Sequence, residues 1–206
     1  MRKLIVFNNV TLDGYFAGVD GDISWAESGS DDAEYSAFVA GNASGGGQLV
    51  LGRVTYEIFA QAWPTLTDEE NWRLVKEAGG EPGEKAEGNP FSDRMNSIPK
   101  YVVSTSLSEV SWNNTTLLRE NIPEEVSLLK QQRGKDILVY GSAELANSLF
   151  QHGLVDEFRL LVFPVIIGKG KRLFKEGVRK AMVLWEVKKY TSGVLLLRYR
   201  PERETG

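Results

Sequence analysis

Three short segments carry the residue types that a phosphate-bearing ligand needs. Each follows an apolar run that predicts a buried strand: Gly52–Thr55 (GRVT), Ser104–Thr105 and Gly141–Glu144 (GSAE). Glycine lets a phosphate approach the backbone, and free N–H groups at a helix start attract its charge. Ligands of open α/β sheets bind at the carboxyl ends of strands, where these segments are expected to lie. Two glycine-containing helix starts in one sheet therefore favour a dinucleotide; plain turn chemistry and helix capping are the alternative interpretations.

The composition excludes several other kinds of site. The chain of 206 residues has no cysteine and one histidine, His152. Disulfides, thiolate nucleophiles, cysteine-ligated zinc and multi-histidine metal centres are therefore excluded. The net charge of −4 lacks the basic excess typical of nucleic-acid binders, and no window approaches the ~18 apolar residues of a membrane span. We expect a cytoplasmic protein that acts on a small molecule, with no metal, nucleic-acid partner or membrane.

Two well-known phosphate-binding patterns are missing. Neither the G-x-G-x-x-G fingerprint of Rossmann folds nor the P-loop pattern G-x-x-x-x-G-K-[ST] occurs. Gly45–Gly47 precedes a predicted strand, and Gly168–Arg172 (GKGKR) follows a strand but lacks a third glycine and a following helix. A conventional Rossmann dehydrogenase and a P-loop ATPase are therefore disfavoured.

Strands and helices alternate along the chain and must position these segments. Apolar runs predict strands, and apolar residues at helical spacing predict helices. The predicted strands are 4–10, 48–51, 101–103, 136–140 and 158–167, the last interrupted by Pro164. The predicted helices are 31–44, 54–61, 123–132 and the segment from 142 to 152. Segments 182–190 and 194–200 predict a C-terminal hairpin. The alternation predicts an α/β fold with a largely parallel sheet, and the hairpin predicts an antiparallel edge.

One segment interrupts this alternation. Residues 77–89 (EAGGEPGEKAEGN) are rich in glycine and charge and hold no apolar residue larger than alanine. Such a composition buries too little surface to offset its ordering entropy. We expect residues 77–92 to form a flexible insertion loop within a single domain that covers residues 1–206. A lid over the substrate is the alternative interpretation.

The motifs in combination resemble the dihydrofolate reductase-like superfamily. They are NNVTLDGYFAGVDGDISW, LVLGRVTYE, KYVVSTSL and ILVYGSAELANSLFQHGLVDEFRLLVFPVIIGKGKRLF. The resemblance extends over roughly residues 3–200 and is closest to the C-terminal reductase domain of the bifunctional riboflavin-biosynthesis deaminase-reductase. It implies a three-layer αβα fold with a mostly parallel central sheet, NADPH as the hydride donor, and frequent homodimers. The zinc motif of the deaminase half is absent.

The resemblance implies roles for the three segments. Gly52–Thr55 would lie along the cofactor phosphates, with Arg53 reaching the adenosine side. Ser104–Thr105 would border the adenosine 2′-phosphate, and Gly141–Glu144 would start the helix under the pyrophosphate. The residues assigned to the cofactor are Asn9, Ala17, Gly52, Arg53, Val54, Thr55, Ser104, Thr105, Gly141, Ser142, Ala143 and Glu144.

The first strand and its following loop are implied to border the nicotinamide and the substrate. Asn9, Asp13 and Ala17 match this region, Trp25 matches the tryptophan that closes the loop, and Asp31 is assigned to the substrate. A dihydrofolate reductase has one acidic residue shortly after this tryptophan that grips the pterin. No acidic residue has that spacing here, so recognition of a pterin is open.

Hydride transfer to a C=N or carbonyl group also needs a proton. Asp13 and Asp32 are the candidate catalytic donors, because a carboxyl group in a partly dry pocket has a raised pKa. A turn role for Asp13 and a charge at a helix start for Asp32 are the alternatives. If neither carboxyl group acts, the donor is water or a tyrosine such as Tyr15 or Tyr56.

These observations predict an NADPH-dependent oxidoreductase. It would reduce a small heterocyclic substrate, either ribosylaminopyrimidine-like, as a 5-amino-6-(5-phosphoribosylamino)uracil reductase does, or pterin-like. The alternative is an NADP(H)-binding or interaction module that has lost catalysis. We also expect a homodimer built partly through Trp185, Leu195 and Leu197 of the hairpin, since an exposed sheet edge needs covering. A monomer that packs these side chains inside is the alternative.

Overall fold

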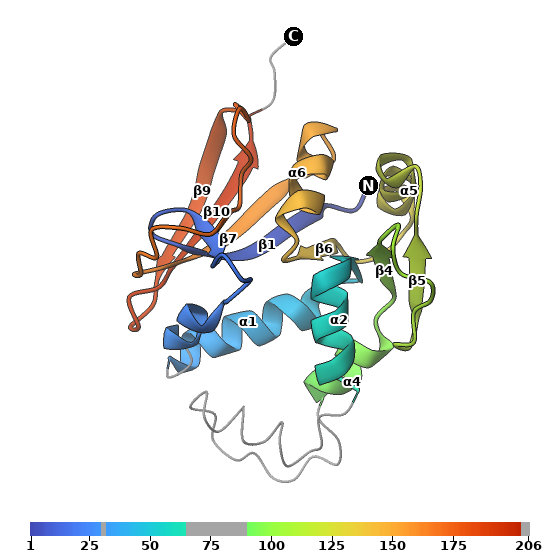
Figure 1. Ribbon diagram of the computed structural model, residues 1–206, viewed down its shortest axis with the longest axis horizontal. Coiled ribbons are helices and arrows are strands. Elements are labelled where there is room, and N and C mark those ends of the chain that lie inside the picture. The colour runs from blue at the N-terminus through green and yellow to red at the C-terminus, as the bar shows by residue number, and fades with distance from the viewer. Residues whose placement is uncertain (30–31, 65–89, 203–206) are drawn as a thin grey trace.

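The computed structural model describes residues 1–29, 32–64 and 90–202, which form three layers (Figure 1). The main strands are β1 (Leu4–Thr11), β3 (Gln48–Gly52), β4 (Lys100–Val103), β5 (Thr115–Leu118), β6 (Ile137–Tyr140), β7 (Glu157–Phe163), β9 (Met182–Lys189) and β10 (Leu195–Pro201). The helices are η1 (Ser24–Gly29), α1 (Ala33–Gly45), α2 (Arg53–Ala62), α4 (Pro90–Ser97), α5 (Ile122–Gln131) and α6 (Ala143–Gln151).

The middle layer is one sheet in the order β5-β4-β3-β6-β1-β7-β10-β9. The strands from β5 to β7 run parallel, whereas β10 is antiparallel to β7 and β9 is antiparallel to β10. Figure 1 shows the β9–β10 hairpin at one edge of the sheet and β5 at the other. The predicted α/β fold with a parallel centre and an antiparallel C-terminal edge is confirmed.

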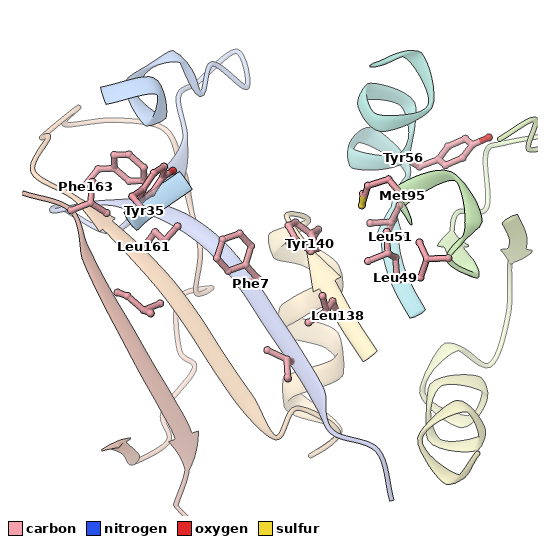
Figure 2. Packing of buried hydrophobic residues seen from close by; sticks show 14 of the residues in the cluster. Phe7, Tyr35, Leu49, Leu51, Tyr56, Met95, Leu138, Tyr140, Leu161 and Phe163 are labelled. Atoms are coloured by element: carbon pink, nitrogen blue, oxygen red, sulfur yellow. The ribbon is translucent and has the colours of Figure 1, made fainter. Parts of the chain in front are cut away.

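Side chains of β1 alternate between the two faces of the sheet and define two apolar clusters. Ile5 and Phe7 belong to the cluster under α1, α2 and α4, and Leu4 and Val6 belong to the cluster under α5 and α6. Figure 2 shows Phe7 beside Tyr140 in the first cluster. Their ring centroids are 5.1 Å apart. Every residue of β3 and β6 is buried because helices cover both faces, which explains their continuous apolar sequences.

Helix α4 is fixed to the sheet by a buried lysine. Lys100 has no exposed surface, and its Nζ donates to the carbonyls of Met95, Asn96 and Ile98 at 2.9, 3.2 and 2.7 Å. The ammonium group also lies 4.3 Å from the centroid of the Trp112 ring. A cation suits the carbonyl end of a helix, although burial lowers the pKa of Lys100 to about 8. Lys100 is also the first residue of β4, the strand that leads into Ser104.

Several elements differ from the sequence-based expectations. β5 and α4 were not predicted, and neither was the small second sheet of β2 (Tyr15–Ala17) and β8 (Lys171–Arg172). The strand expected at 158–167 ends at Phe163, before Pro164, because proline has no N–H to donate to a ladder. Residues 77–89 of the expected insertion lie outside the described residues, and its last positions, 90–92, belong to α4.

The described residues contain neither a membrane-spanning helix nor a metal-binding group of side chains. No helix within 1–29, 32–64 and 90–202 is long and apolar enough to cross a membrane. In the same parts of the chain, no group of three or more histidine, aspartate or glutamate side chains is arranged to hold a metal ion.

Candidate cofactor and substrate site

The fold brings the three glycine- and hydroxyl-containing segments to one edge of the sheet. Gly52 is paired with Val103 at the ends of β3 and β4, and Leu51 is paired with Tyr140 at the ends of β3 and β6. Segments 52–55, 104–105 and 141–144 therefore leave three adjacent parallel strands at their carboxyl ends. Figure 1 shows α2 and α6 starting beside one another at this edge.

Two glycines allow these helix starts to touch. A Cβ atom on Gly52 would lie 2.1 Å from Oγ of Ser142, and one on Gly141 would lie 2.7 Å from Oγ1 of Thr55. Gly141 also has φ of +57°, a backbone conformation that side chains disfavour. Each segment is thus shaped to fit the other, which the sequence shows only as two separate glycines.

Both helix starts lack a side-chain cap. Gly52, which precedes α2, has no capping side chain, and Ser142, which precedes α6, makes no capping hydrogen bond from its hydroxyl. Ser142 has φ of 50°, so its backbone adopts the left-handed conformation. Thr55 lies in the first turn of α2 and not at its cap. The capping interpretation of these two hydroxyls is therefore wrong, and the N–H groups at both helix starts can bind an anion.

The other residues of these two segments differ in exposure. The Arg53 side chain is 46% exposed, and its Nη1 donates to both carboxylate oxygens of Glu57 at 2.9 and 3.0 Å. Val54 is exposed on the outer face of α2, and Glu144 is exposed in the first turn of α6. Ala143 is buried in the apolar cluster under α6, so its side chain serves packing.

One of the two hydroxyl groups expected at the cofactor, that of Ser104, instead stabilises the turn after β4. Oγ of Ser104 accepts from the backbone N–H groups of Ser106 and Leu107 at 3.2 and 3.1 Å, and Ser104 is buried. Thr105 is exposed beside it. Ser104 thus shapes the turn, and Thr105 is the hydroxyl presented at the edge.

The end of β1 offers a buried acceptor. Oδ1 of Asn9 is buried and has no hydrogen-bond partner among the described residues. Its neighbour Asn8 donates to the carbonyl of Gly141 at 3.4 Å and so orients the glycine turn. A buried acceptor without a partner is unfavourable, and a ligand N–H group would satisfy it.

The loop after β1 packs against the loop after β7, a contact that the sequence did not predict. Ala17 is buried in β2, and a Cβ on Gly170 would lie 2.2 Å from the Ala17 carbonyl oxygen. The guanidinium of Arg172 lies over the Tyr15 ring at 4.7 Å. The GKGKR segment, which lacks the Rossmann pattern, therefore places cationic side chains beside the expected nicotinamide region. The spacing of glycine and basic residues after a strand was the available signal.

Asp13 holds these two loops together as an ionised group. It accepts from Oγ1 of Thr11 at 2.6 Å and from the backbone N–H of Gly168 at 2.8 Å. The hydroxyl of Thr11, followed by the loop N–H groups, lowers the pKa of Asp13. The expectation that this pKa is raised for proton donation is therefore wrong, and the turn interpretation fits.

Asp32 caps α1 and fixes the tip of the C-terminal hairpin. Its Oδ1 accepts from the backbone N–H groups of Glu34 and Tyr35, both at 3.0 Å. Its Oδ2 accepts from Oγ1 of Thr191 at 2.6 Å and from the N–H of Ser192 at 3.1 Å. These bonds, that of Thr191 first, hold the pKa of Asp32 well below its usual range. The raised pKa expected for this carboxyl group is also wrong.

The remaining substrate-side candidates are placed as follows. Trp25 of η1 is half-buried and packs edge-on against Phe163, with ring centroids 5.4 Å apart. Asp31 lies outside the described residues. The hydroxyl of Tyr56 accepts from the backbone N–H of Ser111 at 2.9 Å and is buried, so it serves the fold. Tyr15 is half-buried at the start of β2, and its hydroxyl donates to the carbonyl of Gly168 and accepts from the guanidinium of Arg172, both at 3.3 Å.

Comparison with known proteins adds sequence relatives. A model of the RibD C-terminal domain matches residues 2–196. The uncharacterized protein YyaP of Bacillus subtilis is 32% identical over 205 residues, covering 96% of this chain and 94% of YyaP. The uncharacterized protein YwjB of the same organism is 29% identical over 177 residues, covering 85% of this chain and 84% of YwjB.

Solved structures share the fold at low sequence identity. A putative riboflavin biosynthesis protein from Shewanella has a TM-score of 0.68 and 20% identity, and the match covers 98% of this chain and 100% of that one. A deaminase and 5-amino-6-(5-phosphoribosylamino)uracil reductase from Thermotoga maritima has a TM-score of 0.62 and 19% identity, and the match covers 98% of this chain and 57% of that one. With the family match over nearly its whole length, the chain belongs to the RibD C-terminal domain family.

Proposed function

We propose that this protein is an NADPH-dependent reductase of a small heterocyclic substrate of the ribosylaminopyrimidine or pterin type. One observation carries the proposal: α2 and α6 start uncapped and in contact at the carboxyl edge of the sheet. Two adjacent sets of free N–H groups suit the two phosphates of a dinucleotide. Membership of the RibD C-terminal domain family supports the same cofactor.

The residues of the edge fit the parts of NADPH. Gly52 and Gly141 let the two helix starts lie in contact, so that both can face one pyrophosphate, and Arg53 and Thr105 supply a cation and a hydroxyl for the 2′-phosphate. The unpartnered Oδ1 of Asn9 suits the amide N–H of a nicotinamide. When bound, the cofactor supplies the hydride; the protein orients it against the substrate.

The proton comes from water or from Tyr15 in this proposal. Asp13 and Asp32 are held in the ionised form by hydrogen bonds that position loops, so neither is suited to donate a proton. Tyr56 is buried in the fold, where its hydroxyl accepts from the backbone N–H of Ser111. Tyr15, at the start of β2, is half-buried, and its hydroxyl donates to the carbonyl of Gly168 in a solvent-exposed contact.

The same observation about the carboxylates supports a second function, an NADP(H)-binding module without catalysis. A binding module needs the uncapped helix starts but no proton donor. The two functions differ in turnover alone. NADPH that binds but is not oxidised in the presence of ribosylaminopyrimidines, dihydropterins or simple carbonyls would favour the module.

The cofactor assignment is tested with a matched pair of glycine variants. Gly141 and Gly153 have φ of +57° and +68°, so alanine strains the backbone similarly at both. A Cβ on Gly141 meets Thr55, whereas one on Gly153 meets nothing within 4 Å. Isothermal titration should show that NADPH binds the unmodified protein and Gly153→Ala, and that Gly141→Ala weakens binding by about tenfold or more. No NADPH binding to the unmodified protein would overturn the proposed function.

A further inference from the structure

The arginine expected at the 2′-phosphate already has an anionic partner. Nη1 of Arg53 donates to both carboxylate oxygens of Glu57, at 2.9 and 3.0 Å, one helical turn along α2. The sequence motif GRVTYE contains this glutamate, but neither the resemblance nor the edge geometry gives it a role. The carboxylate therefore engages one terminal nitrogen of the cation that a 2′-phosphate would bind.

The Arg53–Glu57 ion pair is exposed, so a bound phosphate can displace the carboxylate, and the charge of Glu57 then acts on that phosphate. Its side chains are 46% and 39% exposed, and exposed pairs of this i, i+4 type contribute little to folding. A 2′-phosphate that takes the place of the carboxylate on Arg53 gains a charge-assisted bond and loses the existing one. It must also approach Glu57, whose like charge opposes the phosphate over this short distance.

The effect differs between the two nicotinamide cofactors. NADPH carries the 2′-phosphate and meets both the competition and the repulsion. NADH has a neutral 2′-hydroxyl, which neither needs Arg53 nor is repelled by a carboxylate. Glu57 therefore acts on the difference between the two affinities, which is what defines specificity.

We propose that Glu57 sets how strongly this protein prefers NADPH over NADH, by competing with the 2′-phosphate for Arg53. This inference rests on the proposed function, because it names a specificity determinant of the same site. Glu57 is thus a restraint on the preference: the arginine attracts NADPH, and the glutamate limits that attraction.

The test replaces the charge and keeps the shape. Glu57→Gln should tighten NADPH binding by about threefold to tenfold at low salt and leave the affinity for NADH within about twofold. The gain should shrink as ionic strength rises toward that of ~1 M salt, where charges are screened beyond about 3 Å. Glu125→Gln, which removes an exposed charge from the first turn of α5, is the matched control and should change neither affinity.

A double-mutant cycle separates competition from general repulsion. In the Arg53→Ala background, Glu57→Gln should give much less of the NADPH gain, because nothing remains to compete for. If the ratio of NADPH affinity to NADH affinity falls or stays the same in Glu57→Gln, the inference is overturned. An equal gain in NADPH affinity with Arg53 present and with Arg53→Ala would also overturn it. Failure of the unmodified protein to bind NADPH would instead overturn the proposed function itself.

Discussion

Asp13 and Asp32 each hold a loop at the carboxyl edge, and each does so as an ionised acceptor. Asp13 joins the loop after β1 to the loop after β7, and Asp32 joins the start of α1 to the hairpin tip. A carboxylate that accepts hydroxyl and backbone N–H bonds is favoured in its charged form, so its pKa falls. The residues that look suited to proton donation by composition are therefore positioning residues for the edge.

The ionised state of Asp32 predicts a pH-dependent contribution to stability. Its folded pKa is lowered, so its stabilisation is present above the unfolded pKa of about 3.9 and is lost as pH falls below that value. Asp32→Asn keeps a capping side chain and removes the charge. It should lower the urea midpoint at pH 7 more than at pH 3.

The exposed Asp20 provides the control, since Asp20→Asn should change the midpoint little at either pH. An Asp32→Asn deficit of the same size at pH 7 and pH 3 would contradict the ionised cap.

Arg53 is predicted to select the cofactor. Charge-assisted hydrogen bonds contribute about 1.5–3 kcal/mol, so Arg53→Ala should weaken NADPH binding about tenfold or more and barely affect NADH. Competitive titration of both cofactors measures the ratio of their affinities. An equal loss for both cofactors would show that Arg53 does not contact the 2′-phosphate.

The contact between Gly52 and Ser142 predicts a rescue experiment. Gly52→Ala places a Cβ 2.1 Å from the Ser142 hydroxyl oxygen and 2.8 Å from its Cβ, so it should lower the melting temperature and weaken NADPH binding. Adding Ser142→Ala removes the nearer atom and should restore part of both losses. Calorimetry and titration check the two effects, and no restoration would show that the clash lies elsewhere.

At the scale of elements, helix α1 keeps a glycine that its surroundings do not require. Gly41 lies inside the helix, and a Cβ there would meet nothing within 4 Å. Glycine in a helix interior costs about 0.5–1 kcal/mol relative to alanine, so Gly41→Ala should raise the free energy of unfolding by that amount.

Gly47, just after α1, gives the opposite prediction. A Cβ there would lie 2.6 Å from the carbonyl oxygen of Lys135, so Gly47→Ala should destabilise the fold. Denaturant unfolding of both variants tests whether available space, and not glycine content, decides the sign. A destabilised Gly41→Ala would contradict this account.

At the scale of the whole molecule, the free edge of the sheet predicts assembly. β9 is the terminal strand, and its Leu184 and Val187 side chains are 46% and 59% exposed. Trp185 is 37% exposed, with the guanidinium of Arg198 4.1 Å from its ring centroid. Leu195 and Leu197, also expected at the edge, are half-buried on β10 between β7 and β9. We propose that two copies cover these apolar side chains by pairing their hairpins.

Sedimentation velocity at micromolar concentration tests this dimer. The unmodified chain should sediment with twice its own mass, and Val187→Glu should convert it to single chains. Leu128→Glu on α5, where the replaced side chain is 56% exposed, is the control and should leave the dimer intact. A single-chain species of the unmodified protein would refute the dimer.

The sequence by itself determined the buried centre of the fold. The strand expected at 48–51 is β3, and the helix expected at 123–132 is α5, because strands and helices covered by a core retain clear apolar patterns. β5 was missed because its residues are half-buried or exposed, which leaves no such pattern in TTLL. The three candidate segments were recognisable because glycine in two of them, and hydroxyl residues in the third, directly follow a buried strand.

Tertiary structure alone decided what the polar side chains do. The N–H of Gly168 that binds Asp13 is 155 positions away in the sequence, and the hydroxyl of Thr191 that binds Asp32 is 159 positions away. Whether a carboxyl group is a proton donor or an ionised anchor depends on such partners, since hydrogen bonds set its pKa. Residue type and local spacing contain no information about groups that distant, so the sequence supplied the candidates and the fold assigned their roles.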